Sequence, residues 1–86
     1  MLTDYIEAAM RKAHYELTEN GGFFATIPKC KGLWAEGATL EKCREELRST
    51  LEDWLLLALQ LGHELPVIGG INLNRSNRKS GQAQTR

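Results

Sequence analysis

The sequence predicts a small α+β domain in which an antiparallel sheet packs on one long helix. Between about residues 13 and 36, three short runs of strand-forming residues are separated by turn residues, an order typical of an antiparallel meander. From residue 40 to 61 the apolar period changes to 3.6, which indicates a helix. The chain has 86 residues, enough for one domain with a single modest core.

Residues 4–12 are expected to form a short amphipathic helix ahead of the strands. Asp4 is the expected N-cap, and Glu7 follows three residues later, as in a capping box. Apolar residues recur at helical spacing: Leu2, Ile6, Ala9, Met10 and Ala13. One short helix cannot bury this stripe alone, so Ile6 and Met10 are expected to lie on the domain or on another subunit.

Three strand segments follow. In the first, residues 13–18, apolar and polar residues alternate, and Leu17 belongs to the apolar set of a half-buried strand. Residues 19–22 read Glu-Asn-Gly-Gly, and Asn and Gly accept the positive φ that tight hairpins need. The second strand is expected at residues 23–27 and the third at residues 33–36, so that consecutive hairpins build the sheet.

The long helix has clear ends and an unusually apolar second half. Thr39 is the expected N-cap, and Gly62 is the expected left-handed C-terminal residue before Pro66. The apolar stripe consists of Leu40, Cys43, Leu47, Leu51, Trp54, Ala58 and Leu61. Further leucines surround the second half, so we expect the sheet to cover one side and a second subunit the other. Leu56 and Leu57 are therefore the expected contacts of a homo-oligomer, a dimer or a tetramer.

The charge distribution divides the chain into a domain and a tail. A last strand is expected at about residues 67–73, interrupted by Gly69 and Gly70, and it closes a domain of residues 1–74 with the order β-β-β-α-β after the first helix. This domain holds all eleven acidic residues but seven of the eleven basic ones, a net charge of −4. Residues 75–86 carry +4 and no large apolar residue, and they are expected to form a disordered basic tail.

No catalytic, cofactor-binding or metal-binding motif is recognisable, and we expect none of these functions. The residues that could bind a metal lack the paired spacing of metal sites: His14, Cys30, Cys43 and His63. Cys43 lies on the apolar stripe and is expected in the core. Lys29 and Lys31 flank Cys30 and could lower its pKa, but an exposed, unreactive loop cysteine is the preferred interpretation. The acidic residues are dispersed as surface charge rather than clustered as in a two-metal nuclease.

The remaining features concern location and nucleic acid. The longest apolar run, residues 54–61, is too short to span a bilayer, and no signal peptide is recognisable, so we expect a cytoplasmic protein without membrane association. In the tail, Arg75, Arg78 and Lys79 could contact nucleic-acid phosphates. Four charges without aromatic residues predict only weak, salt-sensitive attraction.

Four motifs occur in a distinctive order along the chain. Tyr-Glu-Leu at residues 15–17 is followed by Gly-Gly-Phe-Phe-Ala-Thr-Ile-Pro at residues 21–28. Gly-Leu-Trp-Ala-Glu-Gly-Ala-Thr-Leu-Glu at residues 32–41 then leads into the long helix, which contains Leu-Glu-Asp-Trp-Leu at residues 51–55. This order, over about residues 13–71, resembles that of the HicB antitoxin family.

The resemblance implies a fold and a function. The implied fold is a partial, degraded ribonuclease H-like one, a three-stranded antiparallel sheet backed by the helix and extended by a last strand. The implied function is non-catalytic: members bind a small basic toxin of the HicA type, which cleaves messenger RNA, and block its active site. A remnant ribonuclease H activity would require clustered carboxylates, and we expect no turnover.

The chain departs from the family pattern in two places. The loop at residues 29–32 reads Lys-Cys-Lys-Gly, where the family usually has an acidic segment close to Asp-Leu-Pro-Gly. Residues 74–86 are too short and polar for a helix-turn-helix or a ribbon-helix-helix, so DNA binding by this chain alone is not expected. The alternative to an antitoxin is an orphan oligomeric regulatory domain that binds nucleic acid weakly through its basic tail.

Overall fold

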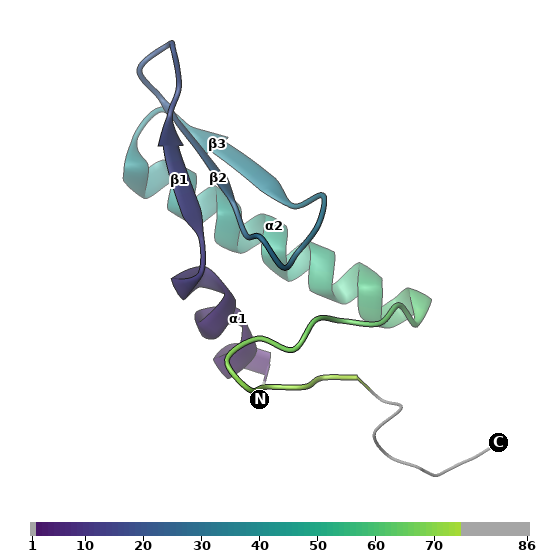
Figure 1. Ribbon diagram of the computed structural model, residues 1–86. Coiled ribbons are helices and arrows are strands. Elements are labelled where there is room, and N and C mark those ends of the chain that lie inside the picture. The colour runs from purple at the N-terminus through teal and green to yellow at the C-terminus, as the bar shows by residue number, and fades with distance from the viewer. Residues whose placement is uncertain (1, 75–86) are drawn as a thin grey trace, which may run out of the picture.

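The computed structural model describes residues 2–74, which form two helices and one three-stranded antiparallel sheet (Figure 1). The elements in chain order are α1 (Leu2–Arg11), β1 (His14–Leu17), β2 (Phe23–Thr26), β3 (Trp34–Gly37) and α2 (Leu40–Leu61). The predicted α+β architecture, with an N-terminal helix, a meander and a long helix, is confirmed. The predicted basic tail with Arg75, Arg78 and Lys79 lies outside the described residues.

The sheet is a meander in the order β1-β2-β3, with α2 behind it in Figure 1. Tyr15, Ala25 and Ala35 lie opposite one another in the register, and the two alanines are buried on the side of α2. Leu17 lies on the same side of the sheet, but the prediction that this side is buried there was wrong, because Leu17 is 71% exposed. The reason is that α2 packs over β3 and β2 but not over β1.

The connection from β3 to α2 depends on a glycine. Gly37 ends β3, and a Cβ atom there would collide with the backbone nitrogen of Cys43 in the first turns of α2. Only a residue without a side chain allows the strand and the helix to approach so closely. This contact sets the position of the long helix on the sheet.

Both predicted ends of α2 are confirmed. The backbone N–H of Lys42 donates to the Oγ1 atom of Thr39 over 3.1 Å, which is the expected N-cap. At the other end Gly62 is left-handed with a φ of 73°. The N–H of the following residue, His63, donates to the carbonyl of Ala58 over 2.9 Å, which completes a Schellman motif.

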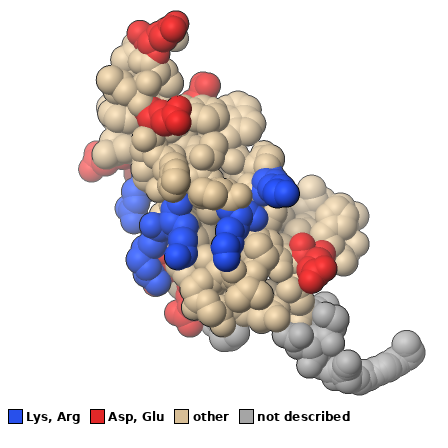
Figure 2. Space-filling model, viewed as in Figure 1, with Lys and Arg blue, Asp and Glu red and all other residues tan. Residues whose placement is uncertain are grey.

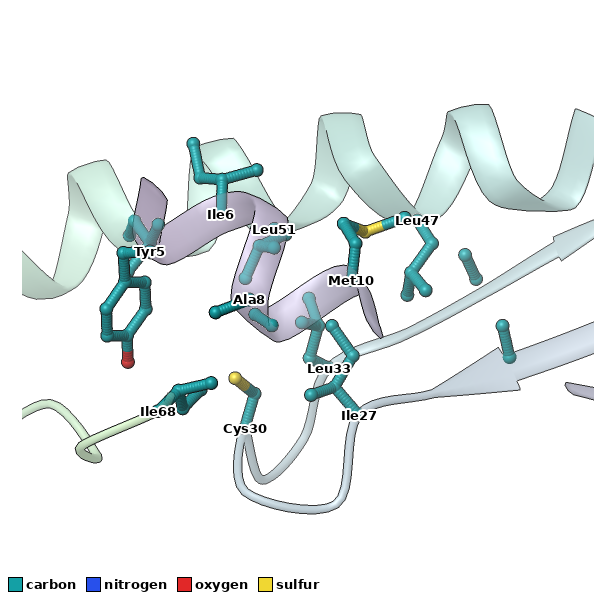
Figure 3. Close-up of a cluster of buried hydrophobic side chains, with 14 of the residues drawn as sticks. Tyr5, Ile6, Ala8, Met10, Ile27, Cys30, Leu33, Leu47, Leu51 and Ile68 are labelled. Atoms are coloured by element: carbon teal, nitrogen blue, oxygen red, sulfur yellow. The ribbon is translucent and has the colours of Figure 1, made fainter. Parts of the chain in front are cut away.

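The first helix completes the core from the side. α1 begins at Leu2, so Asp4 lies in the first turn rather than at the expected N-cap. In Figure 3, α1 crosses in front of α2, and its side chains meet those of the long helix, the loop after β2 and the segment after α2. Ile6 and Met10 are buried in this cluster. Of the two alternatives for the apolar stripe, the structure therefore shows packing on the domain itself.

The predicted last strand at residues 67–73 is not formed. The structure has a single bridge between Ile68 and Ile71, in which the N–H of Ile71 donates to the carbonyl of Ile68 over 2.9 Å. Gly69 and Gly70 between them have φ values of 59° and 77°, the left-handed pair that makes a tight reversal. The two glycines turn the chain back on itself, so these residues cannot continue as one extended strand, and the described part of the sheet keeps three strands.

Two hydrogen-bonding groups fix the segment after α2. The Tyr5 hydroxyl donates to the carbonyl of Pro66 over 2.6 Å and ties α1 to this segment. The side-chain amide of Asn74 accepts from the N–H of Leu65 over 2.6 Å and donates to the carbonyl of the same residue over 2.8 Å. The Asn74 amide thus pairs with the backbone of Leu65 as a neighbouring strand would, and it joins the two ends of the segment that contains the tight reversal.

Candidate interaction surface

The face of the sheet that points away from α2 is open to solvent. It consists of the residues that alternate with the buried alanines, and we refer to it as the open sheet face: His14, Glu16, Phe24, Thr26, Trp34 and Glu36. Four of its six residues are exposed, and the other two are half-buried. A sheet of this kind normally has one packed and one solvated face, and the solvated face here carries more than simple polar residues.

Two aromatic rings form the centre of the open sheet face. Phe24 of β2 and Trp34 of β3 stack with 5.9 Å between their ring centroids and 23° between their planes. Trp34 is 52% exposed. The register places Glu16 and Glu36 on either side of Phe24. An aromatic pair on a solvated sheet face, with carboxylates beside it, is the arrangement expected where a protein binds a cationic partner.

A second apolar surface lies on α2. Three leucines of its second half are more than half exposed, and we refer to them as the leucine patch: Leu56 (56%), Leu57 (56%) and Leu61 (59%). Leu55, in the same half of the helix, is buried in the core. The chain therefore covers one side of this half and leaves the side with Leu56 and Leu57 uncovered. The contact of this side with a second subunit stays a prediction.

The predicted interface residues do not form one site. Leu56 and Leu57 are neighbours on the exposed side of α2, whereas Ile6 and Met10 are enclosed by the chain's own core. An α1 interface built on Ile6 and Met10 would require the core to open. Sequence reasoning identified Leu56 and Leu57 as apolar residues in excess of a simple amphipathic pattern, and both are exposed in the single chain, but it did not identify the open sheet face. The alternation in β2 and β3 was the available signal, since it puts Phe24 and Trp34 opposite the buried alanines.

Both cysteines are buried. Cys43 is in the core, as predicted, and its Sγ atom lies 3.8 Å from the carbonyl of Ala35. Burial, and to a smaller extent the charge of Glu36, raises its pKa. The interpretation of Cys30 as an exposed loop cysteine was wrong, because it is 2% exposed. Burial raises the pKa of Cys30 to about 11, the opposite of the lowering that its flanking lysines suggested.

Two further features of residues 2–74 bear on the class of site. No group of three or more His, Cys, Asp or Glu side chains in this part of the chain is arranged to hold a metal ion. Neither of its helices is long and apolar enough to cross a membrane.

Comparison with known proteins gives a family and a structural relative. The model of the UPF0150-like family matches residues 4–66. The crystal structure of TTHA0281 from Thermus thermophilus has 40% sequence identity to this chain and a TM-score of 0.79, and the match covers 84% of this chain and 90% of that one. No curated protein matches the chain.

Proposed function

The chain belongs to the UPF0150-like family, and we propose that it is a non-catalytic antitoxin of the HicB type. In this proposal it binds a small basic toxin of the HicA type, which cleaves messenger RNA, and it occludes the toxin's active site. The support from the sequence is the order of motifs that resembles HicB antitoxins. The support from the structure is a surface suited to a cationic protein.

The observation that carries the proposal is the open sheet face. Its aromatic pair, Phe24 and Trp34, offers flat apolar area that loses little conformational entropy on binding, the property typical of interface hot spots. The carboxylates of Glu16 and Glu36 flank that pair and are exposed. They would attract a basic partner and discriminate against an acidic one.

The size of this surface sets a condition on the interface. Three strands of four residues present an area of roughly 200 Å², taking about 4.8 Å between strands and about 3.4 Å per residue. A stable protein complex buries about 800 Å² on each partner. The partner must therefore extend beyond the open sheet face, onto the β1–β2 hairpin or the loop before β3. Occlusion needs no chemistry from this chain, since an interface of that size excludes RNA from whatever active site it covers.

The leucine patch supports the second part of the proposal, that the antitoxin is a homo-oligomer. Leu56 and Leu57 lie on α2, and α2 covers the opposite side of the sheet from Phe24 and Trp34. Self-association through the leucine patch would thus leave each open sheet face free. An oligomer of this kind would bind one toxin per chain.

Co-expression tests the proposal. The proposal requires that an adjacent reading frame encodes a small basic protein. The tagged full chain is expressed with that protein and then purified, and the basic protein should be retained in equal amount. Glu16→Lys with Glu36→Lys should lower its retention at least tenfold. Glu41→Lys with Glu45→Lys makes the same charge change at exposed positions of α2 and should not affect retention. Failure of the unaltered chain to retain the basic protein, or equal losses in the two double variants, would refute the proposal.

A further inference from the structure

A basic pocket lies at the end of the sheet where α1 leads into β1. It has a volume of about 320 Å³ and opens between the end of α1, the start of β1 and the loop after β2. Its cationic rim consists of Arg11, Lys12 and Lys29, with the imidazole of His14 beside them, and Ile27 and Ile68 contribute apolar lining. None of the residues that line it is acidic. Two segments distant in sequence, residues 11–14 and the loop after β2, thus place their positive charges around one concavity.

The cations of this basic pocket are exposed, and Lys29 is held in place. Arg11, Lys12 and Lys29 are all exposed, so their charges are available to a ligand. The ammonium of Lys29 donates to the carbonyl of Val67 over 3.2 Å, which fixes it at the rim. An ammonium has three N–H donors, so this bond leaves two for a ligand. Figure 2 shows Lys and Arg side chains gathered across the middle of this face, over the end of α1 and the loop after β2.

An exposed aromatic ring lies on the same face as the pocket. His14 pairs with Thr26, and Thr26 pairs with Trp34, so the three form one row across the sheet. Trp34 is two strand spacings from His14, about 10 Å. Trp34 is half exposed, and Lys31, three residues earlier in the loop before β3, is exposed as well. Positive charge and a stacking surface therefore adjoin each other at this end of the sheet.

We propose that the basic pocket binds the phosphate backbone of single-stranded nucleic acid, with Trp34 stacking on a base. Cations that follow the backbone and aromatic rings that stack on bases are the two components of sequence-tolerant single-strand binding. Glu16 and Glu36, two residues further along β1 and β3, repel phosphate and confine the strand to the pocket end of the sheet. This site is distinct from the tail, and it does not depend on the toxin-binding role.

The test measures binding of a fluorescent uridine oligonucleotide of about ten residues to the full chain without any partner. Contact of three cations with phosphates predicts that binding weakens roughly 20-fold between about 50 and 200 mM salt. Arg11→Gln with Lys12→Gln and Lys29→Gln should weaken binding at least about tenfold at the lower salt, and Trp34→Ala about tenfold. Thermal unfolding of each variant checks that it is folded.

The matched control removes the same number of charges from the tail. Arg75→Gln with Arg78→Gln and Lys79→Gln should leave the affinity within about threefold of the unaltered chain. The proposal is overturned if the unaltered chain does not bind the oligonucleotide, or if the tail variant loses binding while the pocket variant keeps it. It is also overturned if a polyglutamate peptide of equal length competes as well as the RNA, because the pocket would then recognise acidic peptides.

Discussion

Single residues decide how the sheet, the helices and the last segment meet. Gly37 permits the contact between β3 and α2, and Tyr5 joins α1 to Pro66 through its hydroxyl. The sequence predicted Gly37 only as the residue after the third strand, because the requirement for a glycine arises from a helix backbone six residues further on. Cys30 shows the same dependence: its charged neighbours suggested exposure, and only tertiary packing beside Ile68 in the core cluster explains its burial (Figure 3).

Gly37→Ala should lower the free energy of unfolding by about 3 kcal/mol, because the new methyl group would meet the backbone of Cys43, which cannot move aside. Gly21→Ala is the control. Gly21 has a φ of 86° and open space around it, so its replacement should cost only about 1 kcal/mol of backbone strain. Urea unfolding of both variants measures the difference. Equal losses would mean that the close approach of β3 to α2 is not a requirement of the fold.

Tyr5 and Cys30 should make the fold sensitive to alkali. Burial, with a smaller contribution from the Cys30 charge, raises the pKa of Tyr5 from 10.0 to about 12, and burial raises that of Cys30 from 9.0 to about 11. In the unfolded chain both groups ionise first, so their contribution to stability is complete below pH 9 and is lost as the pH rises from 9 to 12. Unfolding midpoints measured across this range should fall steadily. In a variant that removes both buried thiols, Cys30→Ala with Cys43→Ala, the decline should begin about one pH unit later, at the unfolded-state pKa of Tyr5, and an unchanged onset would contradict this assignment.

At the scale of elements, the features that the sequence predicted correctly are those that depend on contacts between residues close together in the chain. The Thr39 cap and the Gly62 terminus are contacts within a few residues, and α2 has the predicted bounds. The prediction of a last strand was wrong because Gly69 and Gly70 adopt left-handed conformations, which reverse the chain. The exposure of Leu17 depended on which strands α2 covers. Alternation along one strand contains no information about that arrangement.

The exposed half of α2 gives a prediction about assembly. Leu56→Gln with Leu57→Gln should convert an oligomer into a monomer without loss of secondary structure, because both side chains are more than half exposed in the single chain. Leu17→Gln is the matched control, since it replaces an exposed leucine at the far end of β1 and should leave the oligomer intact. Sedimentation equilibrium measures the mass of each. A monomeric unaltered chain would show that the leucine patch has another role.

At the scale of the whole molecule, the zero net charge conceals a pattern with three parts. The tail is positive and residues 1–74 are negative, but within residues 2–74 the charges are also separated. Glu16 and Glu36 lie beside the aromatic pair, and the cations of the basic pocket lie where β1 begins. Counting charges along the sequence showed the division between the negative residues 1–74 and the positive tail. The separation within residues 2–74 required the register of the sheet and the packing of α1, which bring Arg11 and Lys29 to one pocket.

Inhibition of RNA cleavage is the measurement that tests the antitoxin role most directly. The toxin that the proposal requires, a small basic protein encoded in an adjacent reading frame, is incubated with messenger RNA, and the full chain is added in increasing amounts. We expect cleavage to stop at one chain per toxin. Phe24→Ala with Trp34→Ala should raise the amount needed by about 30-fold or more, since the loss of one hot spot costs about 2 kcal/mol or more and the costs of two stacked residues are not additive. Cleavage that continues at saturating amounts of the unaltered chain would contradict the proposed function.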